Sequence, residues 1–390
     1  MSKNLFLMVR PICKEHICKD VFLVPRYLGE KLNYNVTIVS PRTLRNVDMP
    51  AKIDGMSVVT IPQRKIKLDL PKIKSDIIII KEIFKRAKEI DVMMIFHFRR
   101  IAKIGALIYK ALNPNGVIYI KLDIDGSGAK QKLERYNHSF MSRLFERLIK
   151  IPLKRIDLLS CETQQAHDYL TQGRFADPKS GQKLIVMENG FDEDILSKLD
   201  IEERNYDQKE KIFTVVGRLG AKQKNNTMLL RALRGIDLKD WQLYLIGPME
   251  ESFRDEVDAL INELPHLRDH IVMTGMITDR KELWELYNRS RVFVHTALYE
   301  SSGLVYYEAK RFRNYIVSTN VGAFEDVTQE GKYGVEVAQD DDAQLAEIMQ
   351  GIIDERISVD CYGEDFDPQS LSWSRQVEKV AQRIKEIKHL

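Results

Sequence analysis

The sequence has few cysteines, no long apolar run and no recognisable secretion signal. Four cysteines in 390 residues are too few for a disulfide framework, which favours reduced thiols in a cytosolic protein. The longest aliphatic run, 77–80, is far shorter than the ~20 apolar residues of a membrane-spanning helix, and the first residues do not resemble a secretion signal. We therefore expect a cytoplasmic protein that does not cross a membrane.

The charges are almost balanced. With 60 basic and 57 acidic side chains the formal net charge is only +3, so composition gives no indication of nucleic-acid binding. Cys13 and Cys18 lack the close spacing of zinc ligands, and no paired histidines follow them. A hydrophobic fraction of 44% and a length of 390 residues are typical of a globular enzyme with two domains.

Short apolar strands alternate with amphipathic helices along the whole chain. Strands are expected at 5–9, 36–40, 91–96, 117–122, 212–216, 241–246, 271–274, 292–295, 315–318 and 334–337. Helices are expected at 21–32, 101–112 and 226–233. This alternation predicts parallel sheets covered by helices on both faces. The predicted fold is α/β, with two doubly wound Rossmann-like domains facing each other across a cleft.

A polar stretch without apolar period, 201–210, is predicted to be the linker between the domains. The N-terminal domain would then cover 1–200 and the C-terminal domain 211–367. Pro368 enforces a break before a last helix within 368–390, which we expect to return to the N-terminal domain. In such folds the loops after the strands lie along one edge, where ligands bind.

One of these loops carries two glutamates. Glu300 and Glu308 stand eight positions apart, separated by a segment that contains Ser302-Gly303-Leu304-Val305. Glycine lets backbone N–H groups approach a phosphate closely, and a helix N-terminus adds a partial positive charge of about half a unit. We expect Glu300 just before the helix and Glu308 in its second turn, where the two carboxylates address opposite ends of one ligand.

A second loop follows the first strand of the C-terminal half and begins with Gly217-Arg218. Arginine offers a planar fork to phosphate oxygens, and lysine offers a compact charge. Arg218 together with Lys224 or Lys222 makes a diphosphate clamp. The sequence does not decide between the two lysines, although Lys224 is the one that directly precedes a helix.

Together the two loops resemble family 4 of the retaining glycosyltransferases, which have two Rossmann-like domains in the GT-B arrangement. The Glu-x7-Glu spacing of Glu300 and Glu308 is similar to that family's hallmark, and Arg218 and Lys224 resemble its diphosphate-binding pair. The resemblance covers nearly the whole C-terminal half, whereas the N-terminal half is similar in layout only. Further matches are Asn189–Asp192, Asn320–Ala323 and Trp373.

The resemblance implies a role for each matched residue. Glu308 would hydrogen-bond the donor ribose, and Glu300 would contact the transferred sugar. Arg218 and Lys224 would neutralise the leaving diphosphate, so that neither a metal nor another cofactor is needed. Transfer would retain the anomeric configuration without a stable covalent intermediate. The other donor-binding positions would be Gly217, Gly275, Met276, Ser302, Gly303, Leu304 and Val305.

The implied substrates are a nucleotide sugar, with a UDP-hexose favoured, and a glycan or lipid-linked acceptor in the synthesis of a cell-surface polysaccharide or glycoconjugate. The N-terminal half departs from the family pattern. Its first loop, 11–20, has no glycine, and Asp123 stands where many members have histidine. His16, His97 and Asp123 are candidates for acceptor or sugar binding, although structural roles are as common for the histidines.

Three alternatives stay open at this stage. The basic amphipathic stretch 143–155 predicts either an ordinary surface helix or peripheral contact with anionic lipid on the inner face of the membrane. Asp123-x-Asp125 fits a metal site less well than a turn before Gly126. Two other functions also fit: a non-catalytic, glycan-binding partner subunit of a glycosyltransferase complex, and a nucleotide-sugar epimerase or hydrolase.

Overall fold

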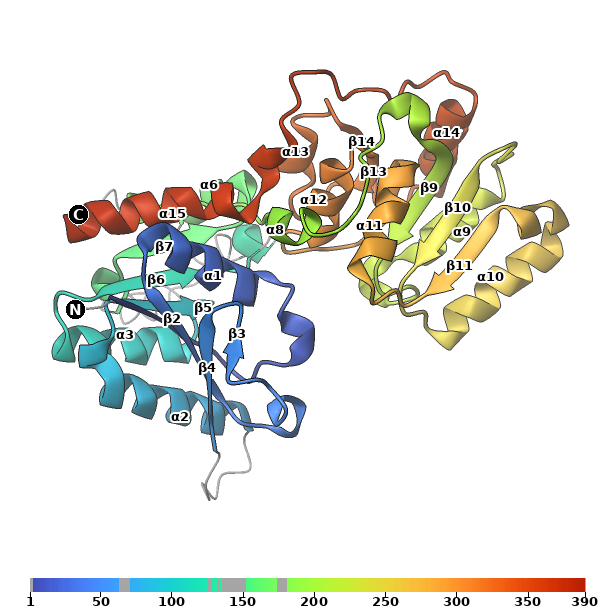
Figure 1. Ribbon diagram of the computed structural model, residues 1–390. Helices are drawn as coiled ribbons and strands as arrows, with labels where there is room; N and C mark the ends of the chain where they lie inside the picture. The colour runs from blue at the N-terminus through green and yellow to red at the C-terminus, as the bar shows by residue number, and fades with distance from the viewer. Residues whose placement is uncertain are drawn as a thin grey trace. The chain divides into compact units, whose positions relative to one another are not determined.

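The computed structural model describes residues 3–62, 71–124, 152–173 and 181–389, together with 126, 128–131 and 134. Contacts between residues divide the chain into two compact units (Figure 1). The N-terminal domain contains Met1–Gly190 and Trp373–Leu390, and the C-terminal domain contains Phe191–Ser372. Each is built on a parallel sheet flanked by helices, so the predicted pair of doubly wound Rossmann-like domains is confirmed.

The sheet of the N-terminal domain has the strand order β3-β4-β2-β1-β5-β6-β7-β8, and only β3 runs antiparallel to its neighbour. Its strands are β1 (Asn4–Met8), β2 (Asn35–Pro41), β3 (Lys52–Ile53), β4 (Met56–Ile61), β5 (Val92–Phe96), β6 (Val117–Lys121), β7 (Leu158–Cys161) and β8 (Leu184–Val186). Its helices include α1 (Asp20–Leu32), α2 (Pro71–Arg86), α3 (Arg100–Leu112), α6 (Gln164–Gln172) and α15 (Trp373–Lys388). The strand order reverses between the neighbouring strands β1 and β5.

The central strands of this sheet are almost continuous apolar runs, as expected where helices cover both faces. Every residue of β6 is buried, including Lys121. The C-terminal helix α15 packs against α1, and Trp373 at its start is only 1% exposed. The last residues of the chain therefore belong to the same unit as the first.

The sheet of the C-terminal domain is parallel throughout, in the order β11-β10-β9-β12-β13-β14. Its strands are β9 (Glu210–Val216), β10 (Gln242–Ile246), β11 (Ile271–Gly275), β12 (Ser290–His295), β13 (Tyr315–Thr319) and β14 (Gly334–Val337). Its helices include α8 (Glu193–Leu196), α9 (Asn226–Leu233), α10 (Glu251–Glu263), α11 (Arg280–Arg289), α12 (Leu304–Arg311), α13 (Phe324–Thr328) and α14 (Asp342–Ile353). Here the order reverses between β9 and β12, which is the switch point where doubly wound sheets bind ligands.

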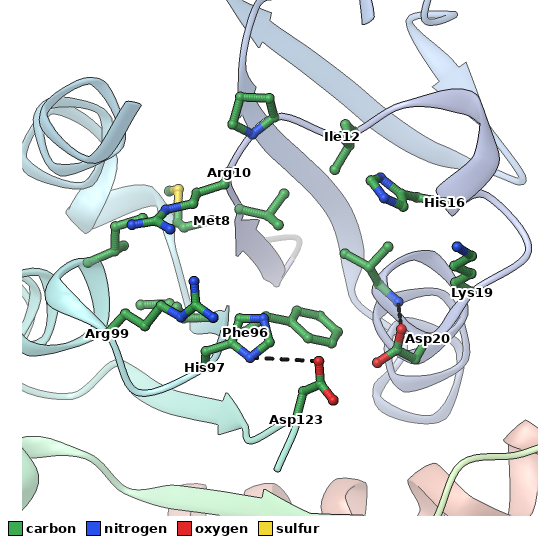
Figure 2. Close-up of a pocket in the computed structure, with 15 residues that line it drawn as sticks. Met8, Arg10, Ile12, His16, Lys19, Asp20, Phe96, His97, Arg99 and Asp123 are labelled. Atoms are coloured by element: carbon green, nitrogen blue, oxygen red, sulfur yellow. Dashed lines mark hydrogen bonds and ion pairs between the residues drawn. The ribbon is translucent and has the colours of Figure 1, made fainter. Parts of the chain in front are cut away.

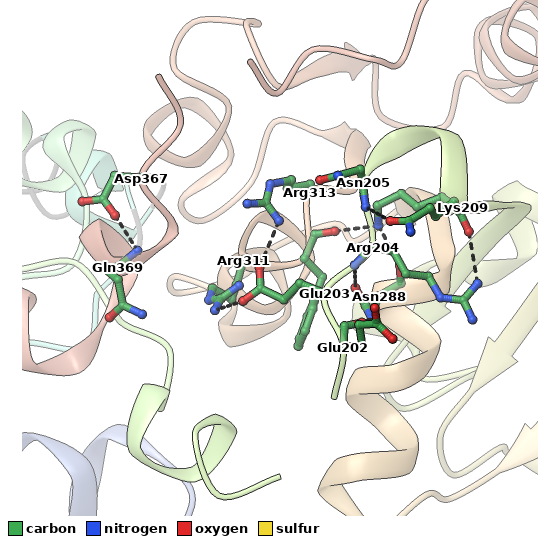
Figure 3. A network of polar contacts seen from close by, with 12 residues as sticks. Glu202, Glu203, Arg204, Asn205, Lys209, Asn288, Arg311, Arg313, Asp367 and Gln369 are labelled. Atoms are coloured by element: carbon green, nitrogen blue, oxygen red, sulfur yellow. Dashed lines mark hydrogen bonds and ion pairs between the residues drawn. The ribbon is translucent and has the colours of Figure 1, made fainter. Parts of the chain in front are cut away.

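The division between the domains falls at Gly190–Phe191, earlier in the chain than the predicted linker 201–210. The polar stretch is held to the C-terminal domain by the network in Figure 3. Arg311 is 2% exposed and forms ion pairs with Glu193 and Glu203. The side chain of Lys209 donates to three backbone carbonyls, among them that of Phe312 at 2.7 Å. A polar composition predicted a free linker, but its charges have partners in the folded domain.

Two sequence predictions fall partly or wholly on residues outside the described set. Of the basic stretch 143–155, only 152–155 are described, and Asp125 is not among the described residues. Within the residues that the structure does describe, none of the helices combines the length and the apolar character needed to cross a membrane.

Candidate functional site

The two loops singled out in the sequence meet at the switch point of the C-terminal domain. The loop after β9 leads to α9, the loop after β12 leads to α12, and the two strands are hydrogen-bonded neighbours. The loops are also joined directly, since the amide of Leu298 donates to the carbonyl of Gln223 at 2.8 Å. The hydroxyl of Thr296 donates to the carbonyl of Lys224 at 3.0 Å. Residues about 75 positions apart are thus held at one edge of the sheet.

Four side chains form a polar network across these loops. The ammonium of Lys224 forms an ion pair with Oε1 of Glu300, and the two side chains are only 13% and 12% exposed. Nε2 of Gln223 lies 3.3 Å from the same oxygen, and Oε1 of Gln223 accepts from Nη2 of Arg218 at 2.9 Å. Lys222 is exposed. Of the two candidate lysines, Lys224 is therefore the one that joins the glutamate.

Gln223 was not predicted, because an uncharged residue between two lysines gives no signal in the sequence. Gly217 lies beside the same network, and its φ of +154° is one that other residues rarely adopt.

The start of α12 is shaped by Gly303. Its φ of +84° is rarely adopted by other residues, and a Cβ at this position would lie 2.9 Å from the ring of Tyr306. Leu304 and Val305 follow as the first helical residues, so their N–H groups are among those without a partner inside the helix. Backbone donors therefore lie at the end of α12 next to the loop that carries Glu300.

Ser302 was predicted to bind the donor, but only its backbone takes part in this loop junction. Its side chain is fully buried, with its hydroxyl 3.3 Å from that of Tyr307, so the hydroxyl faces the core. Its carbonyl accepts from the amide of Ala323 at 3.0 Å, and a Cβ on Gly322 would lie 2.7 Å from that carbonyl oxygen. The segment 320–323 therefore supports the glutamate loop from the next strand.

Glu308 lies in the second turn of α12, as predicted, and its side chain is 15% exposed. Its carboxylate accepts from Arg280 at 2.8 Å, from the indole of Trp284 at 3.3 Å and from Tyr287 at 3.5 Å. All three partners come from α11, and none was predicted as a site residue. They hold the carboxylate in place but leave it partly open to solvent.

The remaining predicted donor residues lie at the end of β11, on the other side of β10 from β9. Gly275 has a φ of +71°, and its carbonyl accepts from the amide of Gly247 at 2.8 Å. Met276 is 66% exposed. The chain here offers main-chain groups rather than a fixed side chain.

His295 ends β12 and was also missed by the sequence analysis. It is 3% exposed, and burial, reinforced by the charge of Lys224, holds the pKa of its imidazole well below the usual range. The ring is therefore neutral at pH 7 and packs edge-on against Tyr306 at 5.1 Å. It forms part of the apolar support under the lysine–glutamate pair.

The weaker candidates His16, His97 and Asp123 all line one pocket of the N-terminal domain (Figure 2). The pocket encloses about 850 Å³, part of it open to solvent, and lies at the ends of β1, β5 and β6. Nδ1 of His97 is 3.9 Å from Asp123, and His97 has a φ of +62°. Burial lowers the pKa of His97 despite the nearby carboxylate, and burial also lowers the pKa of His16. Both rings are neutral at pH 7.

A buried charge cluster lies beside this pocket. Lys121, the last residue of β6, forms ion pairs with Glu162 and, at 2.9 Å, with Asp20, which lines the pocket. Burial alone would lower the pKa of Lys121, but the two carboxylates outweigh it and raise that pKa. Burial also raises the pKa of Glu162 to about 7 in spite of the lysine.

Comparisons with known proteins agree with this arrangement. Residues 197–364 match the family model described as glycosyl transferases group 1. Alpha-maltose-1-phosphate synthase of Mycolicibacterium smegmatis is 24% identical over 211 residues, which cover 51% of this chain and 53% of that protein. The chain spans about half the length of the curated relatives it matches. The match to the family model lies within the C-terminal domain and covers less than half of the chain.

Two solved structures extend the likeness to the whole chain. A glycosyltransferase from Rickettsia africae has a TM-score of 0.69 and 15% identity, covering 99% of this chain and 98% of its own. HepE of Anabaena, solved in complex with UDP, has a TM-score of 0.64 and 15% identity, covering 99% and 97%. The chain therefore has the GT-B fold.

Proposed function

We propose that this chain is a retaining, metal-independent glycosyltransferase that binds a nucleotide sugar at the β9–β12 edge of its C-terminal domain. The observation that carries the proposal is the meeting of Arg218 and Lys224 with Glu300 and the N-terminus of α12. Two cations and a set of backbone donors around one strand end suit a diphosphate. The match of residues 197–364 to the glycosyltransferase group 1 model supports the same assignment.

The residues at this edge of the C-terminal sheet have different roles in the proposed reaction. Arg218 and Lys224 stabilise the negative charge that develops on the leaving diphosphate, which is the electrostatic role that a metal takes in other enzymes. Glu300 positions both the lysine and a hydroxyl of the transferred sugar. Glu308 accepts hydrogen bonds from the ribose, and the main chain at Gly275–Met276 holds the base.

A UDP-hexose is the proposed donor, and the UDP complex of the similarly folded HepE supports it. The pocket with His16, His97 and Asp123 is the proposed acceptor site, for a glycan or a lipid-linked sugar. Asp123, in place of the family's usual histidine, offers carboxylate oxygens that accept hydrogen bonds, and so favours partners with free hydroxyl groups.

The proposal is tested by incubating the purified chain with a panel of nucleotide sugars and following thermal unfolding. A true donor at about 100 times its dissociation constant stabilises the folded state by about 2.7 kcal/mol. Transfer is then measured with that donor in the presence of EDTA, and the anomeric configuration of the product is read by NMR. An inverted product, complete loss of activity with EDTA, or an epimerised donor formed without acceptor would each contradict the proposal.

Glu308→Gln is expected to raise the donor dissociation constant roughly 10–100-fold, since charge-assisted hydrogen bonds are each worth about 1.5–3 kcal/mol. The amide keeps the size of the side chain but loses the charge and one acceptor. Calorimetric titration with UDP measures the change. Glu347→Gln, on the exposed face of α14, is the matched control and should bind UDP like the wild type. Equal affinities of the two variants would remove Glu308 from the donor site.

A further inference from the structure

We infer that Gln223 is a positioning residue, which holds the guanidinium of Arg218 in place for binding the donor diphosphate. The inference rests on the proposed function, in which Arg218 and Lys224 bind that diphosphate, and it adds a residue that the sequence did not indicate. Gln223 lies in the short turn Lys222–Lys224, between the end of β9 and the start of α9. Its contacts tie the loop that carries Arg218 to the loop that carries Glu300.

Gln223 contacts its neighbours with both its side chain and its main chain. Its Oε1 accepts from Nη2 of Arg218 at 2.9 Å, and its Nε2 donates to the carbonyl of Tyr299 at 2.9 Å. The same Nε2 lies 3.3 Å from Oε1 of Glu300. The carbonyl of Gln223 accepts from the amide of Leu298 at 2.8 Å. The residue is thus anchored on the Glu300 loop, and the amide oxygen that meets Arg218 has a defined position.

The partners of Gln223 match the two ends of an amide. The carbonyl of Tyr299 and the carboxylate of Glu300 accept hydrogen bonds, whereas the guanidinium of Arg218 only donates them. A primary amide offers a donor and an acceptor on one planar group, so a single orientation of Gln223 satisfies all three partners. A glutamate at this position would have no donor for the two oxygens, and a lysine would have no acceptor for the guanidinium.

Arg218 depends on this contact more than Lys224 does. Its side chain is exposed, and within the part of the chain that the structure describes no carboxylate forms an ion pair with it. A free arginine side chain loses rotamer freedom when a ligand immobilises it, and a partner that holds the guanidinium beforehand removes part of that cost. Because the amide is uncharged, it leaves the positive charge of Arg218 available to phosphate. The charge of Lys224, by contrast, is already paired with Glu300.

Calorimetric titration of UDP into the full chain tests the inference through Gln223→Met and Arg218→Ala, alone and combined. Methionine keeps the length of the side chain but removes both ends of the amide. We expect Gln223→Met to raise the dissociation constant of UDP roughly tenfold, the scale of one hydrogen bond to a charged group. In the Arg218→Ala background the same substitution should raise it by less than about threefold, since residues that act together are not additive. Equal factors in both backgrounds would assign the effect to the loop itself and overturn the inference.

Gln223→Glu separates the position of the guanidinium from its charge. The carboxylate still accepts from Arg218, but it neutralises the guanidinium and repels the diphosphate, so UDP should bind more weakly than it does to Gln223→Met. The difference between the two variants should shrink between about 20 mM and about 0.5 M salt, because salt screens charges at an exposed site. Tighter binding to Gln223→Glu than to Gln223→Met at low salt would overturn the inference.

Gln242→Met is the matched control. Gln242 is half-buried and begins β10, at the end of the sheet opposite the site, so this variant should bind UDP like the wild type. An equal loss of affinity in Gln242→Met and Gln223→Met would overturn the inference. No measurable binding of UDP to the wild type would contradict the proposed function, whereas unchanged binding to Gln223→Met would contradict this inference alone.

Discussion

Lys224→Ala is expected to lower kcat by roughly 10²–10³-fold, which is the effect of removing one preorganised group from a developing negative charge. The ammonium has a fixed partner before any substrate arrives, because it forms an ion pair with Glu300. In the proposed reaction its attraction would grow as the bond to the diphosphate breaks, so the loss should appear mainly in kcat. The KM for the donor should change by much less.

The matched control for this prediction is Lys222→Ala. Lys222 lies two residues away in the same loop and carries the same charge, but it is exposed and has no contact with Glu300. We expect at most a few-fold change in kcat, because an exposed charge is strongly screened. Steady-state kinetics of both variants, at one ionic strength, decide between the two lysines. A large loss in Lys222→Ala with normal turnover in Lys224→Ala would reverse the assignment.

Glu300 supplies a second check on the same mechanism. Glu300→Gln removes the charge that neutralises Lys224, so the donor diphosphate no longer competes with a carboxylate for the ammonium. We expect UDP to bind at least as tightly to this variant as to the wild type while kcat falls. Calorimetry with UDP and steady-state rates on the same preparation measure both quantities. Weaker UDP binding would show that Glu300 contributes to diphosphate binding rather than opposing it.

The fold was predictable because its signal is local. Apolar runs such as Val92–Phe96 and Val292–Val294 are strands wherever helices cover both faces of a sheet, so composition alone marks them. Four strands of the N-terminal sheet, β3, β4, β7 and β8, escaped prediction. Of these, β3 and β8 have three residues or fewer and so give no periodicity. The domain boundary was displaced for another reason: Glu203 is polar in the sequence but paired with Arg311 in the fold.

The candidate site was predictable where a residue type is demanded by backbone geometry or by charge. Position 303 has a positive φ that favours glycine, and Lys224 and Glu300 neutralise each other as an ion pair. Arg280 and Gln223 could not be found in the same way. Arg280 is the first residue of α11, and Gln223 is an uncharged residue between two lysines, so neither position stands out in the sequence. Ser302 was predicted from its neighbours, yet its hydroxyl turns to the core, and the sequence does not record which way a side chain points.

Lys121→Met is expected to lower the free energy of unfolding by about 3–5 kcal/mol at pH 8, the usual cost of leaving a buried charge without its partner. Lys121 is fully buried and is the cation that holds both Asp20 and Glu162. Asp20 retains some access to water, with 23% of its side chain exposed, whereas Glu162 is at 2%. Most of the penalty should therefore come from Glu162.

The penalty should depend on pH in a direction fixed by Glu162. Burial raises the pKa of this carboxyl in the folded state to about 7, so it is largely protonated at pH 5.5 in the wild type. Removing the lysine removes the main influence that lowers this pKa, and the variant keeps its carboxyl protonated to a higher pH. An acid whose pKa is raised by folding costs stability as the pH increases through that range. The deficit of the variant should therefore be smaller at pH 5.5 than at pH 8.

Urea unfolding at the two pH values measures the effect, and Lys81→Met, at an exposed position of α2, should change stability by less than about 0.5 kcal/mol. The double variant Lys121→Met/Glu162→Met shows whether the cost belongs to the unpaired charge or to the lost side-chain packing. Replacing a whole buried pair by apolar groups is often neutral, so we expect it to regain most of the stability and to lose the pH dependence. A double variant as unstable as Lys121→Met, at both pH values, would assign the cost to packing in β6 instead.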